Sequence, residues 1–110
     1  LDTLLALQTV DDPAIEPYTR ERFADELGIF RTWFAEGLLE VAWPESLAAE
    51  TFDRLIEATQ AQPRCCVHRD FHCRNLMYRP DGRIGVVDFQ DALAGPAAYD
   101  LASLLRDCYY

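Results

Sequence analysis

Lysine is absent from this sequence. All ten basic residues are arginines, they stand against nineteen acidic residues, and the formal net charge is −9. A surface that binds nucleic acid is a basic patch, so this charge balance argues against a nucleic-acid partner. It is compatible with a cationic partner, but net charge speaks first to solubility, and we favour that interpretation.

Long hydrophobic runs are also missing, although half of the residues are apolar. No stretch approaches the roughly 18 consecutive apolar residues that a membrane helix needs. No basic segment followed by an apolar run opens the chain, so no signal peptide is predicted. We therefore expect no membrane partner and a cytoplasmic location. Because the first residue is Leu1 and a helical pattern reaches Tyr110, we expect the sequence to be a piece of a longer chain.

The cysteines lack the paired C-x-x-C spacing of structural zinc sites. Three of the four, Cys65, Cys66 and Cys73, lie within nine residues of one another. This crowding is a poor disulfide framework, and free thiols in a reducing cytosol are the simplest interpretation. A zinc site formed with His68 and His72 is a weaker alternative, because the spacing fits no closed tetrahedral site.

Two helices are predicted in the first half of the chain. Apolar residues recur at intervals of three and four from Phe23 to Leu38, which builds one apolar stripe, and Thr19 is a candidate N-cap. After the break at Trp43-Pro44, a second helix is predicted from about Ser46 to Thr59. Its predicted buried residues are Leu47, Phe52, Leu55 and Ile56.

The second half of the chain changes to short strands around a polar segment. Pro80, Asp81 and Gly82 favour a tight turn, because proline sets its own φ and glycine tolerates positive φ. The sequence therefore predicts an α+β fold with a β-hairpin. The predicted elements are a buried strand at 65–67, hairpin strands at 76–78 and 84–87, a loop with Gly95 and Pro96, and a helix from about Tyr99 with Leu101, Leu104, Leu105 and Cys108 on one apolar face.

The polar segment carries the side chains that can do chemistry. Phosphoryl transfer needs a carboxylate that accepts the proton of the attacking hydroxyl, and oxygen ligands for divalent cations. Asp70, in a loop after a strand, suits the first task, and Asn75 offers an oxygen for the second. Because a hairpin folds its far end beside its beginning, Asp88 is predicted to approach Asn75.

The spacing His68-x-Asp70-x-x-x-x-Asn75, followed by a hairpin and Asp88-Phe89, is shared by protein kinases and aminoglycoside phosphotransferases. The stretch 67–110 resembles the aminoglycoside phosphotransferase and choline kinase superfamily. Within it, the segments DFQDA and GPAAYDLASLLRDCY are most similar to bacterial cell-wall amino-sugar kinases. Those enzymes phosphorylate the anomeric hydroxyl of N-acetylmuramate and N-acetylglucosamine. The resemblance begins at about residue 25.

The resemblance implies a protein-kinase-like C-terminal lobe, mainly helical with a catalytic-loop β-hairpin, that uses ATP and Mg²⁺. It implies a catalytic base at Asp70, and it implies that Asn75 and Asp88 bind the metal and, through it, the nucleotide cofactor. It further implies that His68 and Asp100 support the loop structurally. Asp100 is equally compatible with a plain helix N-cap.

Three residues near these positions need separate interpretation. His72 is a candidate catalytic residue that contacts the acceptor or the γ-phosphate, and packing of the loop is an equal alternative. Asp91 is either a second acid near the metal or a solvated loop carboxylate. Gln90 stands where protein kinases have glycine, so their activation-loop switch is not carried over.

The segment that holds the ATP phosphates in protein kinases and aminoglycoside phosphotransferases has no counterpart in this sequence. No G-x-G-x-x-G segment occurs, and no lysine can pair with the α- and β-phosphates. Both belong to an N-terminal lobe, which would precede Leu1. We therefore predict a helical part at residues 1–62, a part with the catalytic loop, hairpin and following helix at 63–110, and an absent ATP-clamping lobe. Without that clamp, residues 1–110 alone are predicted to be inactive.

The predicted function is ATP-dependent phosphate transfer to a hydroxyl of a small molecule, with the anomeric hydroxyl of an N-acetylated amino sugar as the first choice. An aminoglycoside or choline-type acceptor is one alternative. A pseudokinase that serves as a binding module is another, and the intact Asp70, Asn75 and Asp88 argue against it. The predicted partners are a nucleotide, the acceptor and the missing lobe.

Overall fold

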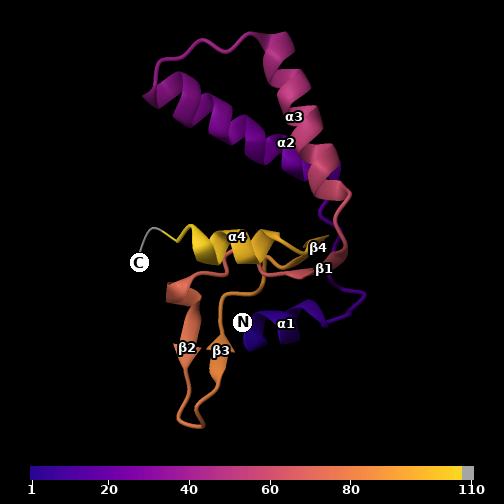
Figure 1. Cartoon of the computed structure of the whole chain (residues 1–110), viewed down its shortest axis with the longest axis vertical. Helices are drawn as coiled ribbons and strands as arrows, with labels where there is room; N and C mark the ends of the chain where they lie inside the picture. Colours follow the sequence, from indigo (N-terminus) through magenta and orange to yellow (C-terminus); the bar gives the residue numbers. More distant parts are fainter. Residues whose placement is uncertain (108–110) are drawn as a thin grey trace. The chain divides into compact units, whose positions relative to one another are not determined.

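The computed structural model describes residues 1–107. The predicted packing of Cys108 on the last helix lies outside the described residues. The chain forms two compact units, one with Leu1–Pro17 and the chain from Gln62 onward, the other with Tyr18–Ala61 (Figure 1). The predicted division into residues 1–62 and 63–110 stays a prediction. The elements in chain order are α1 (Asp2–Gln8), α2 (Arg20–Ile29), η1 (Phe30–Leu38), α3 (Glu45–Gln60), β1 (Arg64–Val67), η2 (Cys73–Asn75), β2 (Leu76–Tyr78), β3 (Ile84–Val86), β4 (Leu93–Pro96) and α4 (Tyr99–Leu105).

The unit Tyr18–Ala61 is helical and begins where the sequence predicts. The side-chain oxygen of Thr19 accepts a hydrogen bond from the backbone N–H of Arg22, so the predicted N-cap is confirmed. The rings of Tyr18 and Phe23 are stacked with their centroids 3.9 Å apart. Both side chains are buried, so this aromatic pair fixes the first turn of α2.

The first long helix changes its hydrogen bonding halfway along. The sequence predicts one helix to Leu38, but η1 is a π-helix, and the N–H of Leu39 bonds to the carbonyl of Phe34, five residues back. This wider turn brings the carbonyl of Thr32 close to Gly37, where an added Cβ would lie 3.0 Å from its oxygen. Because glycine has no Cβ, Gly37 permits the π-helical turn.

Helix α3 buries a narrower face than the sequence predicts. Ala48 and Ile56 are buried, and Phe52 packs edge-on against Trp43 with ring centroids 5.5 Å apart. Leu47 and Leu55 are about half exposed, so the prediction that they are buried is wrong. Positions 48, 52 and 56 are spaced by four and share one helix face, whereas 47 and 55 are rotated to its edge.

The other unit is built on an antiparallel pair of strands, β1 and β4. Its register pairs Cys65 with Gly95 and Val67 with Leu93. The sequence predicts a loop at Gly95 and Pro96, and this prediction is wrong. Pro96 ends the strand, where a missing N–H is tolerated, and pairing with a buried neighbour overrides the low strand propensity of glycine.

The first 17 residues complete this unit. The N–H of Ala94 donates to the carbonyl of Glu16 at 2.8 Å, so the chain ahead of α2 runs along the second edge of β4. The Gln8 side chain, at the end of α1, donates to the carbonyl of Ala97, also at 2.8 Å. Strand β4 is therefore held by β1 on one side and by the N-terminal segment on the other.

Strands β2 and β3 form the predicted hairpin, which projects from this unit in Figure 1. Gly82 has a φ of +78°, and its N–H bonds to the carbonyl of Arg79 at 3.0 Å. The predicted turn at Pro80-Asp81-Gly82 is confirmed. Helices and two small antiparallel sheets together confirm the predicted α+β class.

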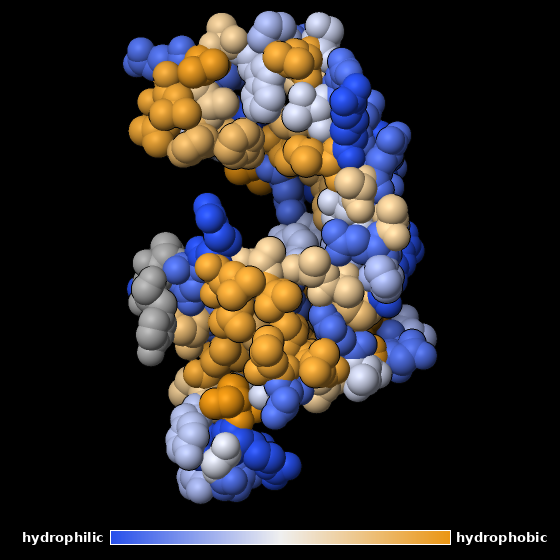
Figure 2. Space-filling view, viewed as in Figure 1, coloured by the Kyte–Doolittle hydropathy of each residue, from blue (hydrophilic) through white to orange (hydrophobic). Residues whose placement is uncertain are grey.

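Apolar side chains gather over α1 and α4 on the face shown in Figure 2. Leu1 and Leu5 at the N-terminal end and Leu105 at the end of α4 are mostly exposed. A patch of this kind is typical of a surface that packs against further protein. Among the described residues, no helix combines the length and apolar character that a membrane crossing requires.

Candidate active site

The site loop, residues 68–75, starts directly after β1 and is held there by one carboxylate. The backbone N–H groups of His68 and Arg69 donate to Oδ2 and Oδ1 of Asp100, at 2.7 and 3.0 Å. Asp100 is the second residue of α4, the N-cap position belongs to Ala98, and no side chain caps this helix. The Asp100 carboxylate therefore bonds to the loop and not to the helix end.

Burial sets the electrostatics of this anchor. Asp100 is fully buried. Burial raises the pKa of its carboxyl above the ordinary value, and the two backbone hydrogen bonds oppose the rise. Arg69 has a φ of +77°, which is a strained conformation for a long side chain. The paired bonds to Asp100 hold this strained residue in place immediately before Asp70.

The His68 side chain ties the loop to the hairpin. Its Nε2 lies 2.9 Å from the carbonyl oxygen of Val87, and because a carbonyl only accepts, Nε2 carries the proton of this bond. The ring is completely buried and meets Phe71 edge-on, with centroids 6.2 Å apart. No hydrogen-bond partner for Nδ1 lies among the described residues. His68 therefore fixes the peptide that precedes Asp88.

Asp70 and Asn75 stand at the two ends of a tight turn. The carbonyl oxygen of Asp70 accepts the backbone N–H of His72 and the side-chain Nδ2 of Asn75, both at 3.0 Å. The amide oxygen of Asn75 is the acceptor that remains on that side chain. Asp70 itself is exposed, so its carboxylate is open to a substrate from solvent.

A second carboxylate holds the far end of the loop, and sequence reasoning missed it. Oδ2 of Asp107 accepts the N–H of Cys73, the first residue of η2, at 2.9 Å. Asp107 lies two residues beyond the end of α4, outside the helix, so helical periodicity does not place it. No local sequence pattern identifies it as an anchor of the loop.

The hairpin brings Asp88 back beside the loop. The N–H of Val87 donates to the carbonyl of Asn75 at 3.1 Å, so Asp88 directly follows a residue bonded to Asn75. Asp88 has a φ of +66°. Such left-handed residues are uncommon outside glycine, and strained conformations cluster at functional sites. The Gln90 side chain donates to Oδ1 of Asp88 at 2.6 Å, which leaves Oδ2 as the second acceptor.

Two predicted candidates remain open. His72 is half-buried within the loop, and the N–H of Asn75 donates to its carbonyl oxygen. Asp91 is exposed after the hairpin. Neither position decides between a contact with substrate or metal and a structural or solvated residue, so both alternatives stay predictions.

Asn75 and Asp88 carry the donor atoms that suit Mg²⁺. This ion prefers oxygen ligands, keeps several waters, and needs only one or two protein ligands beside substrate phosphates. The Asn75 amide oxygen and the Asp88 carboxylate meet that requirement. Among residues 1–107, no group of three or more His, Cys, Asp or Glu side chains is arranged for a metal, so the zinc alternative gains no support.

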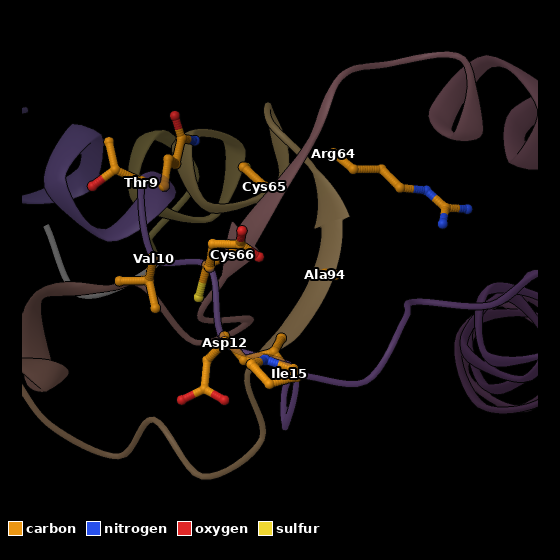
Figure 3. Close-up of a pocket in the computed structure, with 11 residues that line it drawn as sticks. Thr9, Val10, Asp12, Ile15, Arg64, Cys65, Cys66 and Ala94 are labelled. Carbon is orange, nitrogen blue, oxygen red and sulfur yellow. The ribbon is translucent and has the colours of Figure 1, made fainter.

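A cavity of about 420 Å³ lies elsewhere, between the segment after α1 and the β1–β4 pair (Figure 3). None of the predicted site residues lines it. Figure 3 shows the sulfur of Cys66 directed toward the cavity between Val10 and Asp12. Burial raises the pKa of the Cys66 thiol, so this group is a poor nucleophile at neutral pH.

Comparison with known proteins adds independent information. Residues 1–110 match the sequence profile of the phosphotransferase enzyme family. The chain is 44% identical over 110 residues to the N-acetylmuramate/N-acetylglucosamine kinase of Neisseria meningitidis, which covers 96% of this chain and 33% of that protein. It is 40% identical over 113 residues to the enzyme of the same name from Pseudomonas aeruginosa, covering 99% of this chain and 33% of that protein.

The kinase of the same name from Pseudomonas putida is 34% identical, again over 99% of this chain and 33% of its own length. The chain thus spans about a third of the curated relatives that it matches. The predicted resemblance to aminoglycoside phosphotransferases and amino-sugar kinases is confirmed. Because the family profile matches residues 1–110, this chain belongs to the phosphotransferase enzyme family.

Proposed function

We propose that this chain is the part of an ATP-dependent sugar kinase that carries the catalytic base and the metal ligands. The phosphate acceptor is the anomeric hydroxyl of an N-acetylated amino sugar. The observation that carries the proposal is the loop–hairpin arrangement, in which Asp70 and Asn75 share one hydrogen-bonded turn and Asp88 follows a residue bonded to Asn75. The names of the relatives support the choice of acceptor.

Asp70 is the base in this proposal. Its carboxylate is exposed, whereas its backbone carbonyl is fixed by His72 and Asn75. A fixed backbone with an open carboxylate suits a group that must orient an incoming hydroxyl and take its proton. Asp100 holds the loop on the other side of Asp70 through His68 and Arg69.

Asn75 and Asp88 hold Mg²⁺ in this proposal, and through it the nucleotide. When bound, the ion neutralises charge on the phosphates during transfer. Asp88 presents its carboxylate from a strained backbone, and Gln90 orients one of its oxygens. The Asn75 amide nitrogen donates to the Asp70 carbonyl oxygen. The amide oxygen of Asn75 is therefore the atom that can bind the metal.

The chain works as part of a longer protein in this proposal, which we call the parent protein. The relatives are about three times as long as the matched segment. The chain contains neither a lysine nor a G-x-G-x-x-G segment, so another part of the parent protein must clamp the ATP phosphates. The described residues would then belong to a kinase-like C-terminal lobe of a cytoplasmic enzyme, and residues 1–110 alone would be inactive.

The test is ADP release by the purified parent protein with Mg²⁺-ATP. The acceptors are N-acetylmuramate, N-acetylglucosamine, an aminoglycoside and choline, each assayed separately. Release with the N-acetyl sugars alone is the expected result. Release with the aminoglycoside or choline would support phosphate transfer but would overturn the assignment of an N-acetylated amino sugar as the acceptor. Absence of any nucleotide binding would overturn the kinase itself and favour a pseudokinase.

A further inference from the structure

We propose that Asp107 is a positioning residue for Asn75 and thereby tunes the affinity of the site for Mg²⁺. This inference rests on the proposed function, in which Asn75 is a metal ligand. Its structural basis is the 2.9 Å hydrogen bond from the Cys73 N–H to Oδ2 of Asp107. Cys73 opens the three-residue turn η2, and Asn75 closes it.

Helix α4 and the segment that follows it hold the site loop at both of its ends. Asp100, in its first turn, receives the N–H groups of His68 and Arg69 where the loop begins. Asp107, two residues beyond its last residue, receives the N–H of Cys73 where the turn with Asn75 begins. The loop is therefore attached on each side of Asp70, once to α4 and once to the segment that follows it.

The two attachments fix different parts of the site. Asn75 makes bonds to the carbonyl oxygens of Asp70 and His72, and these bonds lie inside the loop. Bonds inside the loop maintain its shape but not its position on the protein. Two bonds come from outside the loop: the Val87 N–H ties Asn75 itself to the hairpin, and Asp107 ties the start of the turn at Cys73 to the segment after α4. Together they set where the turn with Asn75 lies. A hydrogen bond to an ionised carboxylate is also stronger than one between neutral groups.

Loss of the Asp107 carboxylate should therefore act on the metal and not on the acceptor. Groups that orient metal ligands typically change metal affinity about 10- to 100-fold when they are removed. Asp107 acts on Asn75 through the backbone, so we expect the lower end of that range. Asp100 still holds His68 and Arg69, which directly precede Asp70, so the KM for the acceptor should change little.

Hydrogen exchange tests the anchoring without requiring activity. Asp107→Ala is compared in the metal-free parent protein with Asp107→Asn, which keeps an oxygen acceptor. Asp12→Ala is the matched control, because Oδ1 of Asp12 also accepts one backbone N–H, that of Ala14, at 2.9 Å in an exposed loop. Asp107→Ala should speed amide exchange in residues 73–75 about 10-fold, the worth of one hydrogen bond. Asp107→Asn and Asp12→Ala should leave it near the native rate.

Magnesium dependence tests the consequence. Asp107→Ala should raise the Mg²⁺ concentration for half-maximal phosphate transfer about 10-fold, and Asp107→Asn should restore most of the loss. Equal Mg²⁺ dependence of Asp107→Ala and Asp12→Ala would overturn this inference while leaving the proposed function intact. Absence of Mg²⁺-dependent transfer in the unaltered parent protein would overturn the proposed function, and the inference with it.

Discussion

The Nε2 atom of His68 donates a hydrogen bond to the carbonyl oxygen of Val87, 2.9 Å away. The bond joins the residue that begins the site loop to the residue that precedes Asp88, so one buried imidazole links the two segments of the site. Its position also fixes the tautomer, because the proton must be on Nε2.

Replacement of His68 tests this link. His68→Phe keeps the buried ring but removes the donor, whereas His68→Gln places an amide nitrogen near the position of Nε2. Val87 is partly exposed, so its carbonyl can turn to water and the loss is that of one net hydrogen bond. His68→Phe should therefore lower the free energy of unfolding by about 0.5–1.5 kcal/mol, measured with urea. His68→Gln should recover part of it. Equal losses in the two variants would show that the bond to Val87 contributes nothing.

Removal of the proposed base should affect rate and not folding. Asp70 is exposed, and the backbone carbonyl of Asp70, not its carboxylate, makes the bond within the site loop. Asp70→Asn in the parent protein should lower kcat by about 10²- to 10⁴-fold, the usual worth of a general base. The thermal unfolding midpoint should stay unchanged. A variant within about threefold of the native rate would rule out Asp70 as the base.

The strained backbone of Asp88 separates stability from activity. Asp88→Ala and Asp88→Gly both remove the proposed metal ligand, so both should abolish Mg²⁺-dependent transfer. Of these two residues, only glycine adopts a φ of +66° without a steric cost. Asp88→Gly should therefore unfold with a free energy about 1 kcal/mol above that of Asp88→Ala. Equal stability would mean that the loop relaxes out of the left-handed conformation once the carboxylate is gone.

Asp100 should make the free energy of unfolding fall as pH rises. Burial raises its pKa in the folded state, so the folded protein binds this proton more tightly than the unfolded chain. The stability that this proton contributes is therefore fully present below the unfolded pKa of about 3.9. It is lost as pH rises through the higher pKa of Asp100 in the folded protein. Asn cannot titrate, so the unfolding free energy of the native protein minus that of Asp100→Asn should fall with rising pH and then level off. Urea unfolding across this range measures it, and a difference that grows with pH would contradict the assignment.

Two helical glycines should respond oppositely to alanine. Nothing lies within 4 Å of a Cβ added at Gly28 in α2, whereas one at Gly37 in η1 would lie 3.0 Å from the carbonyl oxygen of Thr32. Gly28→Ala should stabilise the protein by about 0.4–1 kcal/mol through the unfolded state. Gly37→Ala should destabilise it or force η1 toward α-helical bonding. Equal stabilisation by both changes in thermal melts would contradict the close approach at Gly37.

Local features of the sequence predicted the fold best. Thr19 and Gly82 act within a few residues of themselves, so their cap and turn could be recognised from neighbouring letters. The strand β4 could not, because Gly95 and Pro96 discourage a strand and only pairing with β1 makes one. Local preference was overridden there by a partner far away in the sequence.

The candidate site divides in the same way. The spacing of Asp70, Asn75 and Asp88 can be read directly, and the hairpin between the last two predicts their approach. The link from His68 to Val87 and the bond from Cys73 to Asp107 depend on how β1, the hairpin and α4 pack together. Such contacts carry no local sequence signal, and Asp107 lies beyond the end of α4, where the helical period no longer applies.

The N-terminal segment along β4 has a consequence for how the chain folds. Because Leu1–Pro17 joins the unit formed after Gln62, the helical unit Tyr18–Ala61 is an insertion within that unit. The segments on either side of the insertion are joined near β4, because the Ala94 N–H donates to the Glu16 carbonyl and the Ala98 N–H donates to the Gln62 side chain. Helices form from local contacts faster than distant strands pair, and a folded insertion shortens the loop that must close. We therefore expect the helical unit to fold first and to bring together the two segments that support the site.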